Sequence, residues 1–306
     1  VNVSTLITGG TGMVGTGFAK YDVLRVGSSD YDLTDFDQCV AMIEENKVDR
    51  IIHLAARVGG VKGNMDFVGD FFRDNILMNT NVLEAARVCE VKKVLSLLST
   101  CIYPDGAPYP LTEKDIHAGP PHESNFGYAY AKRMLHVQSM AYRKQWGCNF
   151  IVAVPNNLYG INDNFHEVYS HVIPAMIRKI QKAKEEKSAM LLLWGDGTPL
   201  REFTYADDIA EILMWMLDNY DDPNPINIGG TKEYSILDLA NTIIKEMDYK
   251  GRIVWDTSMP KGQHRKPSNN EAIKKLFPSF EYTSLEDGIH KTCKWFNETY
   301  PNVRGV

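Results

Sequence analysis

Residues 9 to 15 read Gly9-Gly10-Thr11-Gly12-Met13-Val14-Gly15, directly after the β-branched run Val3–Thr8 and directly before a helical pattern. Gly9, Gly12 and Gly15 form a GxxGxxG spacing, which permits a tight turn, the close approach of a pyrophosphate and close packing of a helix on a sheet. The pattern alone is weak evidence, but its place between a strand and a helix favours a dinucleotide-binding turn over a purely structural one. The cofactor contacts expected here are Gly9, Thr11, Gly12, Met13, Val14 and Gly15.

Short β-branched runs alternate with longer amphipathic stretches through the first half of the chain, which predicts βαβ units and a parallel sheet. Right-handed crossovers would place helices on both faces of that sheet and ligands at the carboxyl ends of its strands. We therefore predict an α/β fold, a Rossmann-type doubly wound sheet followed by a smaller C-terminal substrate-binding α/β domain. The expected strands are Val3–Thr8, Asp22–Gly27, Arg50–Ala55, Lys93–Ser99 and Asn149–Val154.

The pattern becomes less regular after Pro155, so we place a nucleotide-binding domain at 1–156 and a substrate domain at 157–306. This boundary leaves open a return of segments around 203–230 to the first domain. The second domain is expected to hold one strand and three helices, namely Met190–Trp194, Val172–Lys187, Asp207–Leu217 and Ile236–Met247.

Two long helical patterns, Phe67–Cys89 and Gly127–Gln145, carry more apolar positions than one sheet face can cover. This favours a homodimer that forms through these helices. Burial of both helices against the sheet is the alternative that periodicity leaves open.

The composition excludes several function classes. A net charge of -6 in 306 residues lacks the basic face that a nucleic-acid or anionic-membrane binder needs. No apolar run approaches the roughly 20 residues of a membrane helix, and five scattered cysteines without CxxC spacing fit reduced thiols. We therefore expect a cytoplasmic protein. His166 and His171 have no third ligand at a plausible spacing, so we expect no metal site.

A second motif, YxxxK, joins Tyr128 and Lys132 at the start of a helical pattern, and Tyr128 is the only tyrosine followed by lysine four positions later. Residues four apart share a helix face, so Lys132 is expected to lower the pKa of the Tyr128 phenol from about 10 and to anchor the nicotinamide ribose. YxxxK alone is a common coincidence. It gains weight because Ser99, at the end of the fourth predicted strand, could hold a substrate carbonyl beside Tyr128.

The end of the second predicted strand bears on the choice of dinucleotide. It lacks the acidic residue that holds the ribose hydroxyls of NAD, which leaves room at Ser28 for the 2′-phosphate of NADP. Arg25 would help to neutralise that phosphate, whereas Asp30 would oppose it. Asp35 suits the adenine edge, with helix N-capping as the alternative.

Together with these motifs, five further stretches carry a resemblance to the extended short-chain dehydrogenase/reductase family. Within that family the chain looks like enzymes that invert C3 and C5 of GDP-4-keto-6-deoxy-D-mannose and reduce its C4 carbonyl. The stretches are His53-Leu54-Ala55-Ala56 with Val58-Gly59-Gly60, Ser99-Thr100-Cys101-Ile102-Tyr103-Pro104, Asn157-Leu158-Tyr159-Gly160 with Asp163-Asn164-Phe165, Ser170-His171-Val172-Ile173-Pro174, and Trp194-Gly195 through Arg201-Glu202-Phe203.

The resemblance implies roles that the residue types can physically perform. It makes Cys101 and His171 the base and acid of the inversions, beside Ser99, Tyr128 and Lys132. Without the resemblance, Cys101 would more often be a small buried hydrophobe and His171 a surface polar residue. NADP(H) is the implied cofactor, held by the glycine loop and by Ser28, Asp35, Ala55, Ala56, Val58, Tyr128, Lys132 and Asn157.

The implied substrate is a small-molecule GDP-sugar, with cations on the diphosphate and apolar groups around the base. The positions that match are Asn157, Leu158, Val172, Lys179, Trp194, Arg201 and Lys266. The chain departs from the family pattern at Thr11, Ser28 and Ser29, where relatives commonly place arginine or lysine, so the preference for NADP over NAD stays open. Lys179 also stands where some relatives carry arginine.

Two other functions remain open from the sequence. One is a nucleotide-sugar 4-epimerase or 4,6-dehydratase of the same fold, although such dehydratases carry an acidic residue where this chain has Cys101. The other is a non-catalytic NADP-sensing protein, which fold-level analogy alone does not exclude.

Overall fold

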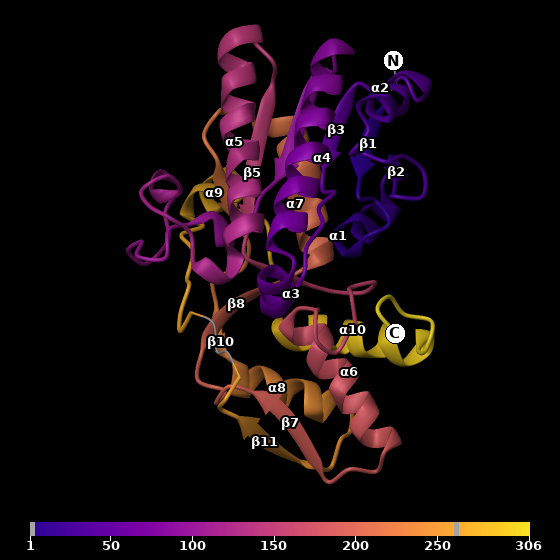
Figure 1. Cartoon of the computed structure of the whole chain (residues 1–306), viewed down its shortest axis with the longest axis vertical. Coiled ribbons are helices and arrows are strands. Elements are labelled where there is room, and N and C mark those ends of the chain that lie inside the picture. Colours follow the sequence, from indigo (N-terminus) through magenta and orange to yellow (C-terminus); the bar gives the residue numbers. More distant parts are fainter. Residues whose placement is uncertain (1–3, 260–262) are drawn as a thin grey trace.

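The computed structural model describes residues 4–259 and 263–306, and it is built as a larger unit stacked on a smaller one (Figure 1). The start of the first predicted strand, Val3, lies outside the described residues. The larger unit contains a six-stranded parallel sheet in the order β2-β1-β3-β4-β5-β9. Its strands are β1 (Thr5–Thr8), β2 (Leu24–Val26), β3 (Arg50–His53), β4 (Lys93–Leu97), β5 (Phe150–Pro155) and β9 (Ile226–Ile228).

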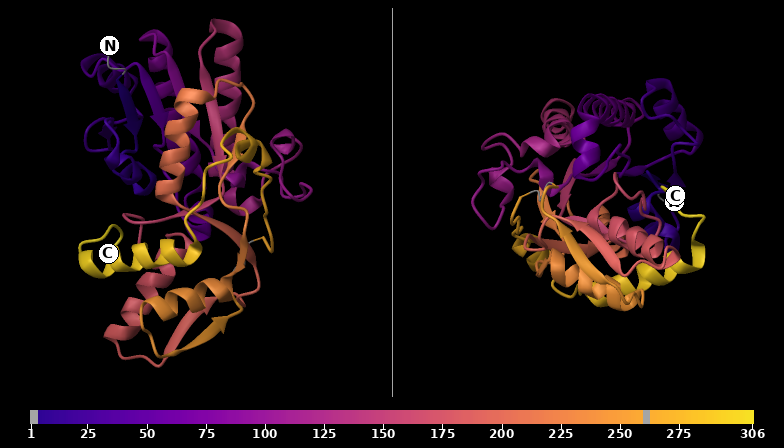
Figure 2. Two further views of the ribbon diagram at one scale, coloured as in Figure 1. Left: turned by 180° about the vertical axis from the view of Figure 1, so that it is seen from behind. Right: turned by 60° about the horizontal axis from the view of Figure 1, so that its bottom comes forward.

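Helices cover both faces of this sheet, which confirms the predicted doubly wound architecture. Successive strand residues point to opposite faces, so Leu6 packs in one apolar core and Ile7 in the other. One face is covered by α2 (Phe36–Glu45), α4 (Val68–Val88) and α5 (Phe126–Trp146). The other is covered by α1 (Met13–Thr16), the 3-10 helix η1 (Gly17–Lys20), α7 (Ala206–Asn219) and α9 (Glu271–Leu276), and α7 crosses it in Figure 2.

The smaller unit has its own core, between a three-stranded sheet, a two-stranded parallel pair and three helices. The sheet has the order β10-β8-β6, from β10 (Glu233–Ser235), β8 (Leu200–Tyr205) and β6 (Asn157–Tyr159). The pair joins β7 (Met190–Trp194) to β11 (Arg252–Asp256), and the helices are α6 (Val172–Glu185), α8 (Ile236–Glu246) and α10 (Leu285–Thr299).

The predicted helices and the predicted strand at 190–194 are present, whereas several short elements differ. The helix expected at 207–217 in the second domain packs instead on the sheet of the larger unit, as the open alternative for segments around 203–230 allowed. The first helix ends at Thr16 and continues only as η1, and β2 spans just three residues because it is an edge strand that pairs with β1 alone. The fourth strand ends at Leu97, before Ser99, whose side chain instead caps the 3-10 helix η2 (Thr100–Ile102). Neither β9 nor α10 was expected from the sequence, although Leu285, Ile289, Cys293 and Phe296 on α10 repeat with a helical period and are buried.

Three short elements complete the larger unit. They are α3 (Val61–Asp66), which faces the smaller unit (Figure 1), η4 (Glu123–Asn125), which packs against α3, and η3 (Glu113–Asp115), where Glu113 accepts from the N–H of Asn227 on β9. Nowhere in residues 4–259 and 263–306 is there a helix both long and apolar enough to cross a bilayer. The carboxyl ends of the parallel strands point toward the smaller unit, so ligands of the sheet would meet residues from both units.

Candidate active site

The glycine loop lies between β1 and α1, and its glycines are required by close contacts. Gly9 has a φ of +66°, in the left-handed region that glycine adopts without strain. A Cβ atom on Gly15 would lie 2.4 Å from the carbonyl oxygen of Gly9. The N–H of Gly10 donates to the carbonyl of Val26 at 2.8 Å, which joins the loop to the end of β2. The loop therefore has the tight turn and close helix packing that a pyrophosphate cradle requires.

A residue of the smaller unit also fixes this loop. The side-chain amide of Asn162 donates to the carbonyl of Thr11 at 2.7 Å and to the hydroxyl of Thr16 at 3.1 Å. Sequence reasoning gave Asn162 no role, although it lies inside a stretch that carried the family resemblance. The two units are thus joined at the expected cofactor loop.

The end of β2 bears on the expected 2′-phosphate site. The carboxylate of Asp30 accepts a hydrogen bond from the N–H of Gly27 at 2.7 Å, so it is engaged with its own turn. Arg25 lies directly beside Gly10, where an added Cβ would approach the Arg25 Cβ to 2.6 Å. Ser28 and Ser29 are exposed at the same rim. The rim thus offers hydroxyl groups and one cation.

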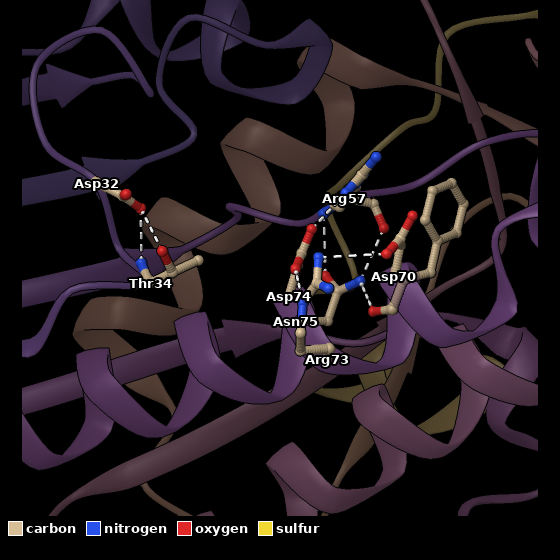
Figure 3. Close-up of polar contacts among 8 residues, drawn as sticks. Asp32, Thr34, Arg57, Asp70, Arg73, Asp74 and Asn75 are labelled. Carbon is tan, nitrogen blue, oxygen red and sulfur yellow. Dashed lines mark hydrogen bonds and ion pairs between the residues drawn. The ribbon is translucent and has the colours of Figure 1, made fainter.

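The segment that follows β3 is held by α4 (Figure 3). The side chain of Asn75 accepts from the N–H of Arg57 at 3.0 Å and donates to the carbonyl of Arg57 at 2.8 Å. The Arg57 guanidinium pairs with Asp74 and lies 5.7 Å from the ring centroid of Phe71. These contacts fix the backbone of the predicted cofactor residues Ala55, Ala56 and Val58, and sequence reasoning missed both Arg57 and Asn75.

Asp35 serves its own helix in this structure. Its carboxylate accepts from the backbone N–H groups of Asp37 and Gln38, at 2.9 and 3.3 Å, and so caps α2. Nearby, the Asp32 carboxylate accepts from the backbone and hydroxyl of Thr34 (Figure 3). N-capping therefore accounts for Asp35, and its contact with the adenine edge stays a prediction.

The YxxxK pair lies on the first turns of α5, against the end of β4. Tyr128 and Lys132 are 8% and 2% exposed. The Lys132 Nζ lies 6.0 Å from the ring centroid of Tyr128 and donates to the carbonyl of Leu97 at 2.8 Å. The Ser99 hydroxyl accepts from the N–H of Cys101 at 3.4 Å. The structure thus brings the predicted serine, tyrosine and lysine to one edge of the sheet.

The expected pKa of Tyr128 is wrong for this structure. Burial raises the pKa of the phenol, and a negative charge on the nearby Cys101 would raise it further. Burial also lowers the pKa of Lys132 to about 8. The ammonium group points to the Leu97 carbonyl, so a dry environment decides the Tyr128 pKa rather than a direct contact with Lys132.

Cys101 and His171 come from different units and share Lys266 as an electrostatic neighbour. Burial raises the pKa of the Cys101 thiol, while Lys266, the hydrogen bond with Ser99 and Lys132 oppose that rise. Burial and then Lys266 lower the pKa of His171. The His171 side chain is exposed. It is the N-cap residue of α6, but its ring makes no capping hydrogen bond.

The segment that carries Lys266 is held by a buried carboxylate that sequence reasoning missed. Glu202, 1% exposed on β8, accepts from the backbone N–H of Ser268 at 3.1 Å and from its hydroxyl at 2.6 Å. Arg201 also donates to the carbonyls of this segment, at Gln263 and His264. The predicted phosphate cation Arg201 therefore lies beside Lys266, but several of its donors already bind backbone.

The remaining predicted substrate residues lie on β6, α6 and β7. The Lys179 Nζ lies 4.7 Å from the ring centroid of Trp194. The Asn157 amide donates to the carbonyl of Glu202 at 2.8 Å, and Leu158 and Val172 are partly buried. Trp194 also lines a cavity of about 140 Å³ whose opposite wall is α3, with Val61, Met65 and Asp66. No sequence signal marked α3 as part of a binding site.

The His166 side chain makes hydrogen bonds within its own turn. Its Nδ1 accepts from the backbone N–H groups of Val168 and Tyr169, at 3.1 and 3.2 Å. Among the residues that the structure describes, no group of three or more histidine, cysteine, aspartate or glutamate side chains could hold a metal ion.

A glycine loop after the first parallel strand, together with a buried tyrosine and lysine one helical turn apart, defines a Rossmann-fold oxidoreductase. Residues 5–229 match the NAD dependent epimerase/dehydratase family. A GDP-L-fucose synthase of Dictyostelium discoideum is 41% identical over 312 residues, which cover 98% of this chain and 97% of that protein. A GDP-L-colitose synthase of Yersinia pseudotuberculosis is 36% identical over 300 residues, covering 95% and 97%.

Solved structures agree with these matches. A GDP-L-fucose synthetase from Naegleria fowleri bound to NADP has a TM-score of 0.92 and 38% identity, and the match covers 99% of this chain and 96% of that one. The chain therefore belongs to the NAD dependent epimerase/dehydratase family.

Proposed function

We propose that this chain is a GDP-L-fucose synthase, which inverts C3 and C5 of GDP-4-keto-6-deoxy-D-mannose and then reduces C4 with NADPH. The proposal is supported by relatives of that name over nearly the whole chain. The observation that carries it is the meeting of Cys101 and His171 from separate units around Lys266, at the edge that holds Tyr128.

Each inversion is a proton transfer at a carbon next to the C4 carbonyl. The Cys101 thiolate removes the proton, the C–H electron pair moves into an enolate, and protonated His171 delivers a proton to the opposite face of that carbon. Solvent then restores both groups. The positive charges of Lys266 and Lys132 support this step because they favour the thiolate that Cys101 must reach.

The reduction uses Ser99, Tyr128 and Lys132. When bound, NADPH supplies a hydride to C4. Tyr128 gives its proton to the C4 oxygen, which the Ser99 hydroxyl holds by a hydrogen bond. The Lys132 ammonium stabilises the phenolate left on Tyr128 until solvent returns the proton. The residues fit the cofactor because the glycine loop is packed tightly at Gly9 and Gly15 and is held by Asn162.

The GDP part of the substrate would extend from this site into the smaller unit. Lys179, Arg201 and Lys266 would hold the diphosphate, and Leu158, Val172 and Trp194 would surround the base. The cavity between Trp194 and α3 supports this placement, because its lining is largely apolar and also includes the paired side chains of Lys62 and Asp66, which suits a nucleobase.

A homodimer through α4 and α5 is part of the proposal. These neighbouring helices cover the sheet on one side and leave Phe72, Leu77, Met134 and Val137 at least 37% exposed. Light scattering after gel filtration should give twice the chain mass, and the pair Leu77→Glu with Val137→Glu should give the monomer. Leu192→Glu, at an exposed apolar position on β7, is the matched control and should keep the dimer.

We also propose a cytoplasmic location. All five cysteines are free thiols, which suits a reducing compartment. Fractionation of cells that carry the tagged chain would test this, and recovery in a membrane or secreted fraction would contradict it.

The function is tested by the loss of reduced-nicotinamide absorbance with GDP-4-keto-6-deoxy-D-mannose and NADPH or NADH, with products separated by chromatography. GDP-fucose formed with NADPH preferred would support the proposed substrate, reaction and cofactor together. Cys101→Ser should abolish or greatly slow deuterium uptake from D2O at C3 and C5 while keeping some direct C4 reduction. Absence of oxidation with either cofactor would favour the dehydratase, epimerase or sensor alternatives.

A further inference from the structure

Arg133 follows Lys132 on α5, and its guanidinium is buried with 5% exposure. Its Nε donates to the carbonyl of Ile102 at 3.1 Å, and Nη2 donates to the same oxygen. Its Nη1 donates to the carbonyl of Gly119 at 2.8 Å. One side chain therefore fixes two segments of backbone next to the candidate active site.

The first of these segments is the turn that carries Cys101. The turn begins at Ser99, whose hydroxyl accepts from the Cys101 N–H, and ends at Ile102, whose carbonyl binds Arg133. Thr100 and Ile102 are buried, while Cys101 is partly exposed between the two anchors. Removing either anchor would let the thiol move relative to Tyr128, which lies on the same helix as Arg133.

The charge of Arg133 has no carboxylate partner. Within residues 4–259 and 263–306, no aspartate or glutamate forms an ion pair with it. Its neighbours are the ring of Tyr130, 5.3 Å from the guanidinium carbon, and two electrostatic partners, Cys101 and His117, whose pKa burial and then Arg133 lower. A buried cation is costly unless it is paired or hydrogen bonded, and here the carbonyls of Ile102 and Gly119 supply the hydrogen bonds. Because no carboxylate neutralises it, the charge of Arg133 acts on the groups around it.

We propose that Arg133 is a positioning residue for Cys101, which holds the Thr100–Ile102 turn through the Ile102 carbonyl and places a buried positive charge beside the thiol. This inference rests on the proposed function only in that Cys101 is the base. The other charged or titratable groups around Cys101 are Lys132 on the same helix, Lys266 from the smaller unit and Tyr128. Arg133 differs from both lysines because it binds the turn itself.

The test compares two variants. Arg133→Met removes both the charge and the guanidinium hydrogen bonds to Ile102 and Gly119, whereas Arg133→Lys keeps the charge but not this set of hydrogen bonds. Arg143→Met is the matched control, because Arg143 also lies on α5 and donates to backbone carbonyls, but at Phe150 and Asp221. The first readout is the pH profile of iodoacetamide alkylation of Cys101, followed by mass spectrometry of its peptide. The second is deuterium uptake at C3 and C5 of the keto sugar.

Arg133→Met is expected to move the alkylation midpoint to higher pH and to slow deuterium uptake about tenfold, since one pKa unit changes the thiolate fraction by that factor. Arg133→Lys should keep the wild-type midpoint but lower the uptake rate, with KM unchanged. Arg143→Met should match the wild type in both readouts. If Arg133→Met does not fold, Arg133→Lys tests the proposal alone, and an uptake rate equal to that of the wild type would then overturn it.

A wild-type midpoint in Arg133→Met would overturn the proposal, as would an equal loss of uptake in Arg143→Met. Failure of the proposed function would look different. The wild-type protein would then take up no deuterium, whereas the alkylation profiles would still report whether Arg133 acts on Cys101.

Discussion

The Nζ of Lys132 donates a hydrogen bond to the carbonyl oxygen of Leu97, at 2.8 Å, and so joins the second turn of α5 to the last residue of β4. The lysine is 2% exposed, and burial lowers its pKa to about 8 from 10.5. Burial thus disfavours the charged form of Lys132, so the protein gains little stability from a cation that the proposed reduction requires.

Lys132→Met should leave the free energy of unfolding at neutral pH equal to or above that of the wild type, while abolishing reduction. The folded-state pKa is below the unfolded value, so the unfolded state binds more protons between about pH 8 and pH 10.5. Wild-type stability should therefore rise relative to the variant by about 2 kcal/mol between about pH 7 and about pH 9.5. Urea unfolding of both proteins at each pH measures this, and a constant difference would contradict it.

Tyr128→Phe should slow the reduction at C4 by about 10²- to 10⁴-fold, because the proposed proton donor to the C4 oxygen is lost. Deuterium uptake at C3 and C5 should continue at a rate close to that of the wild type, since Cys101 and His171 remain. Tyr130→Phe is the matched control, because Tyr130 packs on Arg133 and Phe126. Equal losses in both reactions for Tyr128→Phe would show that the two steps do not use separate residues.

Arg25→Met should raise the dissociation constant of NADPH several-fold and leave that of NADH unchanged. The side chain lies beside Gly10 at the rim with Ser28, whereas Asp30 is engaged with the N–H of Gly27. A surface cation on a phosphate contributes on the order of 1 kcal/mol. Calorimetric titration with both cofactors measures this, and an equal effect on NADH would place Arg25 away from the 2′-phosphate.

Asp163→Asn should stabilise the protein above neutral pH. Asp163 is 6% exposed, one of its carboxylate oxygens has no hydrogen-bond partner, and burial raises its pKa to about 7. Between about pH 4 and about pH 7 the folded state therefore holds a proton that the unfolded state has lost, so the stability of the wild type falls as the pH rises through this range. The gain at about pH 8 is at most about 4 kcal/mol and should shrink toward about pH 4.

Asp32→Asn is the control for Asp163→Asn. Hydrogen bonds from Thr34 lower the pKa of Asp32, so this change should stabilise nothing at any pH. Thermal unfolding across the pH range compares the two, and a gain for Asp32→Asn would show that removal of charge alone explains the effect.

The sequence allowed five of the six strands of the larger sheet, the glycine loop and the YxxxK helix to be predicted, because their signals are local. The glycine spacing lies within seven residues, and Tyr128 and Lys132 lie within one helical turn. Asn75, Asn162 and Glu202 were missed because each acts on backbone far away in sequence, at Arg57, Thr11 and Ser268. The sequence around such a polar residue does not indicate its backbone partner, because only the fold brings the two together.

By itself, the sequence determined the parallel sheet, the dinucleotide loop and the YxxxK helix, since periodicity and short spacings fix local geometry. Only the tertiary structure decided the electrostatics. Burial raises the pKa of Tyr128 although Lys132 lies one turn away. The fold also brings the charges of Cys101, His171 and Lys266 close enough to interact, although residues 101 and 266 lie 165 positions apart in the chain. A pKa depends on desolvation and on charges in space, and neither quantity is written in the spacing of residues along a chain.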